Sequence, residues 1–129
     1  MAPLSPVALT CGEPAGIGPE ISVKARAILG ASVPLFWMGD PRHLPPGTAF
    51  QVIARPGEAH EVPGDVLPVL PHPFSAPATP GKITYANARG VIEVIARAVD
   101  LVTRGEALAI CTAPLHKKAL KDGAGFVHP

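Results

Sequence analysis

A turn rich in glycine and proline, at residues 12–19, is the segment of this sequence best suited to binding a ligand. Gly12, Gly16 and Gly18 allow backbone conformations that other residues avoid, and they let a ligand approach the main chain. Pro19 suits a first helical position, where its missing N–H is not needed. Such a turn between a strand and a helix leaves free N–H groups at the helix start. The chemistry predicted for this turn is therefore the binding of an anion.

A second candidate segment is an apolar run near residue 110 that leads into Thr112, His116 and Lys117. The ammonium of Lys117 either binds a phosphate or carboxylate group or lies solvated on a helix surface. His116 either exchanges a proton near neutral pH or is a helix-capping or surface residue. In the first turn, Glu13 either orients the loop by accepting backbone N–H groups, the interpretation we favour, or contacts the ligand.

Alternating strands and helices are predicted to position both segments. Strands are predicted at residues 6–10, 33–38 and 108–111, helices at 20–29, 85–103 and 115–121, and short strands at 50–54 and 66–70. This alternation predicts an α/β sandwich with a mainly parallel sheet. Ligands of such sheets collect beyond the carboxyl ends of the strands, where both segments lie. The two loops are therefore expected to face one crevice.

Composition narrows the class of protein. The 129 residues amount to one ordinary domain, and 47% hydrophobic residues with a mean hydropathy of +0.29 argue against disorder. A formal net charge of +1 gives no electrostatic footprint for nucleic acid or an anionic membrane. No apolar run is long enough for a membrane span, and residues 1–6 lack the features of a signal peptide. We therefore expect a cytoplasmic protein with neither nucleic acid nor membrane as a partner.

Cysteine and histidine placement predicts no metal site within this sequence. Cys11 and Cys111 are expected to be reduced thiols with buried structural roles. The histidines show no ligand pair or cluster at helical spacing; they are His43, His60, His72, His116 and His128.

Two motifs resemble one known family. Residues 12–20, Gly-Glu-Pro-Ala-Gly-Ile-Gly-Pro-Glu, closely resemble the N-terminal signature of the 4-hydroxythreonine-4-phosphate dehydrogenase family. Residues 107–120 resemble its apolar strand followed by Thr-Ala/Gly-Pro-Ile/Val/Leu-Asn/His-Lys, and Asp-Gly-Ala-Gly-Phe follows at the expected place. A weaker resemblance covers Gly81, Lys82 and Asn87. The family likeness extends over essentially the whole chain.

The resemblance implies an isocitrate/isopropylmalate dehydrogenase-like fold, a three-layer sandwich. The family continues beyond the position of Pro129, so residues 1–129 are expected to be the N-terminal part of a two-domain α/β dehydrogenase, truncated and inactive alone. Three metal-binding histidines, a threonine-bearing substrate motif and most contacts to NAD or NADP would follow residue 129. We assign no catalytic or cofactor residue here. The expected substrate-binding residues are Gly12, Glu13, Gly16, Gly18, Thr112, His116 and Lys117.

The implied activity is oxidation of 4-phosphohydroxy-L-threonine by NAD or NADP, with a divalent metal, followed by decarboxylation to 3-amino-2-oxopropyl phosphate. This reaction belongs to vitamin B6 (pyridoxal phosphate) biosynthesis, and the family implies a homodimer. Two alternatives stay open. The protein could be a dehydrogenase of another four-carbon sugar-acid phosphate, or this chain could be a non-catalytic binding or scaffold fragment.

Overall fold

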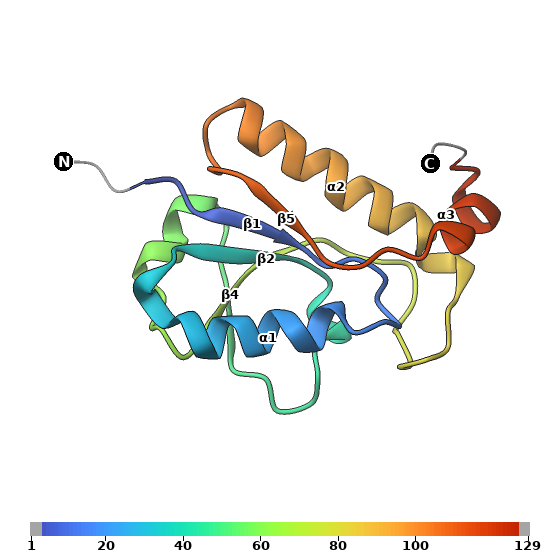
Figure 1. The fold of residues 1–129 in the computed structure, drawn as a ribbon, viewed down its shortest axis with the longest axis horizontal. Helices are drawn as coiled ribbons and strands as arrows, with labels where there is room; N and C mark the ends of the chain where they lie inside the picture. The colour runs from blue at the N-terminus through green and yellow to red at the C-terminus, as the bar shows by residue number, and fades with distance from the viewer. Residues whose placement is uncertain (1–3, 127–129) are drawn as a thin grey trace.

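Five parallel strands form the centre of the fold, and helices cover both faces of the sheet (Figure 1). The computed structural model describes residues 4–126, so His128 and the first three residues lie outside the described part. The strands are β1 (Val7–Thr10), β2 (Leu35–Gly39), β3 (Phe50–Val52), β4 (Leu67–Pro71) and β5 (Ile110–Thr112). The α-helices are α1 (Gly18–Leu29), α2 (Ala88–Thr103) and α3 (Lys117–Ala124). Short 3-10 helices lie at Gly30–Ser32, Pro41–His43, Pro56–Glu61 and Tyr85–Asn87.

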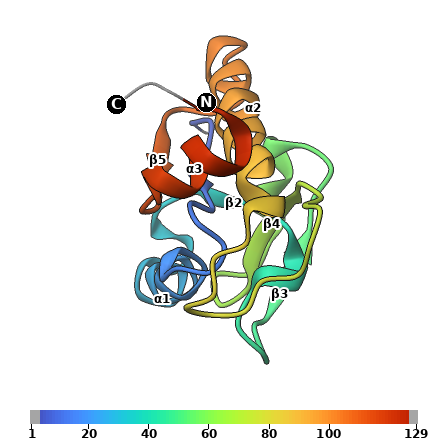
Figure 2. The same cartoon turned by 90° about the vertical axis from the view of Figure 1, so that its right-hand side faces the viewer.

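The strand order is β3-β4-β2-β1-β5, and every neighbouring pair is parallel. In the view of Figure 2, α1 lies on one side of the sheet, and α2 with α3 lies on the other. The predicted three-layer α/β sandwich with a parallel sheet is therefore confirmed for residues 4–126. The short strands expected in the proline-rich stretch are present as β3 and β4, and β4 lies between β3 and β2.

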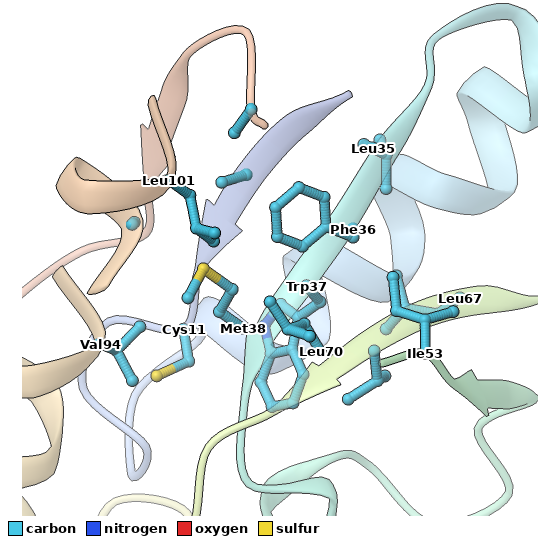
Figure 3. Close-up of a cluster of buried hydrophobic side chains, with 14 of the residues drawn as sticks. Cys11, Leu35, Phe36, Trp37, Met38, Ile53, Leu67, Leu70, Val94 and Leu101 are labelled. Atoms are coloured by element: carbon cyan, nitrogen blue, oxygen red, sulfur yellow. The ribbon is translucent and has the colours of Figure 1, made fainter. Parts of the chain in front are cut away.

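The core is built around β2, whose five residues are all buried. Phe36, Trp37 and Met38 are fully covered, as expected of a continuous apolar strand with a layer on each face (Figure 3). Helix α2 covers one face with an apolar stripe that includes Val94 and Leu101. At about 25 cal/mol per Å² of buried apolar surface, these large side chains supply much of the drive to fold.

Helix α1 is held in place by polar as well as apolar atoms. Arg26 is 3% exposed, and its guanidinium donates to the backbone carbonyls of Val66, Gly30 and Pro63 at 2.9–3.0 Å. A buried cation is tolerated here because several carbonyl oxygens satisfy its N–H groups. Meanwhile Ile28, on the same helix, is 83% exposed.

Three sequence predictions need correction. The helix expected at residues 85–103 starts as a 3-10 turn, and α2 begins only at Ala88. The strand expected at 108–111 begins two residues later and ends one residue later, and it is not buried, because β5 is an edge strand with β1 on one side only. Cys111 on that strand is exposed, whereas Cys11 is buried as expected.

Candidate functional site

The two segments singled out in the sequence contact each other at the carboxyl ends of β1 and β5. Thr10 and Thr112 are paired in register on the two strands. Beyond them, the N–H of Ala113 donates to the Thr10 carbonyl at 3.2 Å, and the N–H of Glu13 donates to the Pro114 carbonyl at 3.0 Å. The loops are thus joined by backbone hydrogen bonds, on the edge of the sheet where ligands of parallel sheets bind.

Gly12 and Gly18 allow this close approach. Gly12 has φ +67°, and a Cβ placed on it would lie 2.5 Å from the Pro114 oxygen. A Cβ on Gly18 would overlap the Cys11 carbonyl oxygen and lie 2.9 Å from the Ala113 Cβ. Both glycines are buried against the neighbouring loop, so they shape the turn. Gly16, by contrast, is exposed.

Glu13 holds the turn through its own backbone and carboxylate. Its Oε2 accepts the N–H of Ala15 at 3.0 Å, and its carbonyl accepts the N–H of Gly16 at 3.0 Å. A carboxylate that accepts a backbone N–H two residues ahead stabilises a tight turn. The loop-orienting interpretation of Glu13 is the one that these contacts favour.

His116 is the N-cap of α3. Its Nδ1 accepts the N–H of Ala119 at 3.1 Å, so in the neutral ring the proton is carried by Nε2. The capping role considered in the sequence is present, and it leaves Nε2–H as a donor. Lys117 follows at the first position of the helix, and its side chain is exposed.

A cavity of about 300 Å³ lies between the two loops and a third segment near residue 81. The N–H of Gly81 donates to the Ala15 carbonyl at 2.8 Å, which anchors that segment to the turn. The cavity is lined by Glu13, Ala15, Gly16, Ile17, Gly81, Ile83, Pro114, Leu115 and His116. Its walls are mainly apolar, with a carboxylate and an imidazole as the titratable groups.

The structure brings three of the predicted site residues to this cavity: Glu13, Gly16 and His116. Thr112 instead lines a groove of about 250 Å³ beside α1. Sequence reasoning missed the apolar wall formed by Ile17, Ile83 and Leu115, residues that are 38–57% exposed. The signal that could have found this wall is the apolar residues of the recognised segments, because Ile17 and Leu115 lie inside the two motifs and Ile83 directly follows Lys82. A further cavity of about 530 Å³, lined by Ser5, Arg55 and Glu106 among others, lies by the amino ends of β1 and β5, at the opposite ends of these strands from the two loops.

Two ionisable groups near the strand ends have displaced pKa values with structural causes. Burial raises the pKa of the Cys11 thiol to about 12, so this cysteine is not a nucleophile at neutral pH. For Asp40, burial alone would raise the pKa of the carboxyl group. Hydrogen bonds from Arg42 and from the Phe74 N–H outweigh burial, and the net result is a pKa lowered to about 2. Asp40 is therefore an anion at neutral pH, and it holds Arg42 and the Phe74 N–H in place.

Metal binding does not fit the described side chains. Within residues 4–126, no three His, Cys, Asp or Glu side chains gather closely enough to hold a metal ion.

In the same range no helix is long and apolar enough to cross a membrane.

Comparison with known proteins identifies the family. The family model described as pyridoxal phosphate biosynthetic protein PdxA matches residues 28–129. A 4-hydroxythreonine-4-phosphate dehydrogenase of Roseobacter denitrificans is 58% identical over 97% of this chain and 38% of its own length. The Paracoccus denitrificans protein of the same name is 56% identical over 100% of this chain and 38% of its own.

A solved structure supports the same relationship. The 4-hydroxythreonine-4-phosphate dehydrogenase of Klebsiella pneumoniae superposes with a TM-score of 0.82 at 33% identity, over 93% of this chain and 40% of that one. The isocitrate/isopropylmalate dehydrogenase-like fold implied by the sequence is confirmed by such neighbours. The chain spans about 38% of the length of the curated relatives it matches. It belongs to the pyridoxal phosphate biosynthetic protein PdxA family.

Proposed function

We propose that this chain supplies the N-terminal side of the substrate cleft in an NAD(P)-dependent 4-hydroxythreonine-4-phosphate dehydrogenase. The protein would oxidise the secondary alcohol of 4-phosphohydroxy-L-threonine, passing a hydride to NAD(P)⁺ and a proton to solvent. Loss of CO₂ from the resulting β-keto acid would give 3-amino-2-oxopropyl phosphate. The observation that carries the proposal is the hydrogen bond from Glu13 to Pro114, which joins the two family motifs beside one cavity.

The residues would divide the work of binding. Lys117, exposed next to the cavity residue His116, supplies the positive charge for the substrate phosphate. The Nε2–H of His116 donates to a substrate oxygen, because its Nδ1 is occupied by the helix cap. Glu13 orients the turn, and Gly12 and Gly18 shape it. Thr112 lies at the margin of the cleft, since it lines the neighbouring groove.

The divalent metal and the nicotinamide cofactor of the family have no ligand set that we can assign here. The described residues do not assemble a metal site, and the turn departs from Gly-x-Gly-x-x-Gly, because Ile21 stands three residues after Gly18. We therefore assign to this part of the chain only the binding and orientation of the phosphorylated substrate. For the full-length protein we propose a cytoplasmic homodimer, on the strength of the family resemblance.

The test is a pair of matched lysine variants in a full-length protein that carries this chain. With 4-phosphohydroxy-L-threonine and NAD⁺, Lys117→Gln should raise KM about tenfold, because a charge-assisted hydrogen bond is lost. Lys118→Gln, which removes a neighbouring charge that is also exposed, should leave KM unchanged. NADH absorbance measures both.

Other outcomes separate the alternatives. NADH formation with a four-carbon sugar-acid phosphate, and none with 4-phosphohydroxy-L-threonine, would replace the proposed substrate. Absence of activity together with absence of binding heat for substrate on the 129-residue chain would favour a scaffold fragment. Equal effects of the two lysine variants would remove Lys117 from the site.

A further inference from the structure

The signature turn has a second cavity on its other side, of about 470 Å³. The turn forms one wall, the segment after β2 forms another, and residues 78–80 close it. Gly16 lines both this cavity and the candidate substrate cavity, so the turn separates the two. The proposed function makes no use of this space, which we call the proline cavity.

Arg42 is the cation that lines the proline cavity, and its guanidinium is held in a fixed orientation. Its Nη2 donates to Asp40 Oδ2 at 2.9 Å and to the Phe74 carbonyl at 2.8 Å, and its Nε donates to Asp40 at 3.1 Å. Asp40 is itself fixed by the Phe74 N–H at 3.0 Å. The Arg42 side chain remains 50% exposed. Within residues 4–126, Nη1 makes no hydrogen bond, so its N–H groups stay available to an acceptor.

Proline rings make up much of the remaining wall. Pro14 and Pro19 come from the turn, Pro45 and Pro46 from the segment after β2, and Pro80 from the closing segment. A pyrrolidine ring has no N–H, so these walls offer apolar surface and no competing donor. Ligand pockets commonly combine mainly apolar walls with a few placed polar groups. The shape and chemistry favour a flat apolar ring.

The charges around the proline cavity indicate which anionic group a ligand could carry there. The charges of Arg42 and Asp40 cancel, and Glu20, which also lines the cavity, is paired with Lys24 at 3.0 Å. One added carboxylate can be met by the unused Nη1 group of Arg42. A phosphate dianion would bring twice that charge, and the residues that line the cavity include no Lys or Arg besides Arg42. A single carboxylate therefore suits the site better than a phosphate.

We propose that the proline cavity binds a small aromatic carboxylate, with its ring against the proline faces and its carboxylate on Arg42 Nη1. This site is independent of the phosphorylated-substrate cleft, and its occupant contacts the reverse side of the same turn. Binding in the proline cavity should therefore change the environment of Gly16, which borders both cavities.

The test uses benzoate as the probe and backbone amide NMR shifts of the ¹⁵N-labelled 129-residue chain as the readout. Benzoate should shift the Gly16, Leu44 and Ala78 signals saturably. Benzamide has the same shape without the charge and should bind about tenfold more weakly, because it loses a charge-assisted bond. Inorganic phosphate should produce no saturable shift at Leu44 or Ala78.

A pair of arginine variants completes the design. Arg42→Gln should lower the benzoate affinity about tenfold, to that of benzamide, whereas Arg89→Gln, an exposed cation on α2, should leave it unchanged. If Arg42→Gln fails to fold, the benzoate and benzamide comparison decides alone. Equal binding of benzoate and benzamide, shifts confined to Leu115 and His116, or no saturable shift would overturn the proposal. None of these results depends on whether the dehydrogenase assignment holds.

Discussion

The backbone N–H of Glu13 donates to the carbonyl of Pro114 at 3.0 Å, and this bond links the two loops that follow β1 and β5. It is possible because Gly12 has no side chain: a Cβ there would lie within 2.5 Å of the Pro114 oxygen. The close approach of the two loops therefore depends on Gly12 as well as on the pairing of β1 with β5.

Gly12→Ala should therefore destabilise the chain by about 3 kcal/mol. About 1–2 kcal/mol comes from forcing a side-chained residue to positive φ, and the rest from the clash with Pro114. Gly47→Ala is the matched control, since Gly47 has φ +79° and no atom within 4 Å of an added Cβ. It should cost only about 1 kcal/mol. Urea unfolding measures both, and equal losses would show that the loop contact is not the cause.

His116→Ala should lower the free energy of unfolding by about 1 kcal/mol, because α3 loses its N-cap. His116→Asn should preserve stability, since the asparagine carbonyl can accept the Ala119 N–H in place of Nδ1. The resembled family carries Asn or His at this position, as a capping requirement predicts. In the full-length protein, any loss of substrate affinity in His116→Asn then reports the missing Nε2–H. If His116→Ala had the same free energy of unfolding as the unaltered chain, the capping role would be contradicted.

The sequence predicts those features of the fold that depend on the residue pattern within one element, and it does not predict those that depend on contacts between distant segments. The apolar stripe of α2 and the continuous apolar run of β2 were recognisable, because periodicity reports which faces are covered. The insertion of β4 between β3 and β2 was not predictable, since strand order depends on contacts between distant segments. For the same reason the exposure of Cys111 was missed: its short apolar run looks the same in an edge strand and in a central one.

The candidate site shows the same division. Motif residues and their strand-end positions came from the sequence, but the cavity wall of Ile17, Ile83 and Leu115 did not. Ile83 lies two residues after Gly81, whose N–H donates to the Ala15 carbonyl, and this contact joins segments that are distant in the sequence. Apolar residues at half exposure resemble core residues in a sequence, so only the structure separates them.

The two cysteines should differ sharply in reactivity. In the 129-residue chain at neutral pH, a thiol reagent should label Cys111 at least about 100-fold faster than Cys11, because Cys11 is 1% exposed and burial raises its thiol pKa to about 12. Absorbance of the released chromophore gives the two rates. Cys111→Ser should abolish the fast phase and leave the slow one. Rapid labelling of both thiols under native conditions would show that Cys11 is accessible.

Acid should unfold the chain partly through Asp40. Its pKa is lowered from 3.8 to about 2 in the folded protein, so its ionised form stabilises the fold fully above about pH 4. That contribution, about 2 kcal/mol, is lost as the pH falls from 4 through 2, because the folded state then gains the proton that the unfolded state already holds. Urea unfolding across this range measures the slope.

Asp40→Asn removes the titrating group, so its stability should change less between pH 4 and pH 2 than that of the unaltered chain. At pH 7 it should be less stable, since the bidentate bond to Arg42 is lost. Asp100→Asn provides the control: its carboxylate is 62% exposed and pairs with Arg104 on the surface of α2. A surface pair contributes little, so this variant should keep the acid slope of the unaltered chain. Matching slopes for Asp40→Asn and the unaltered chain would mean that other carboxylates govern acid unfolding.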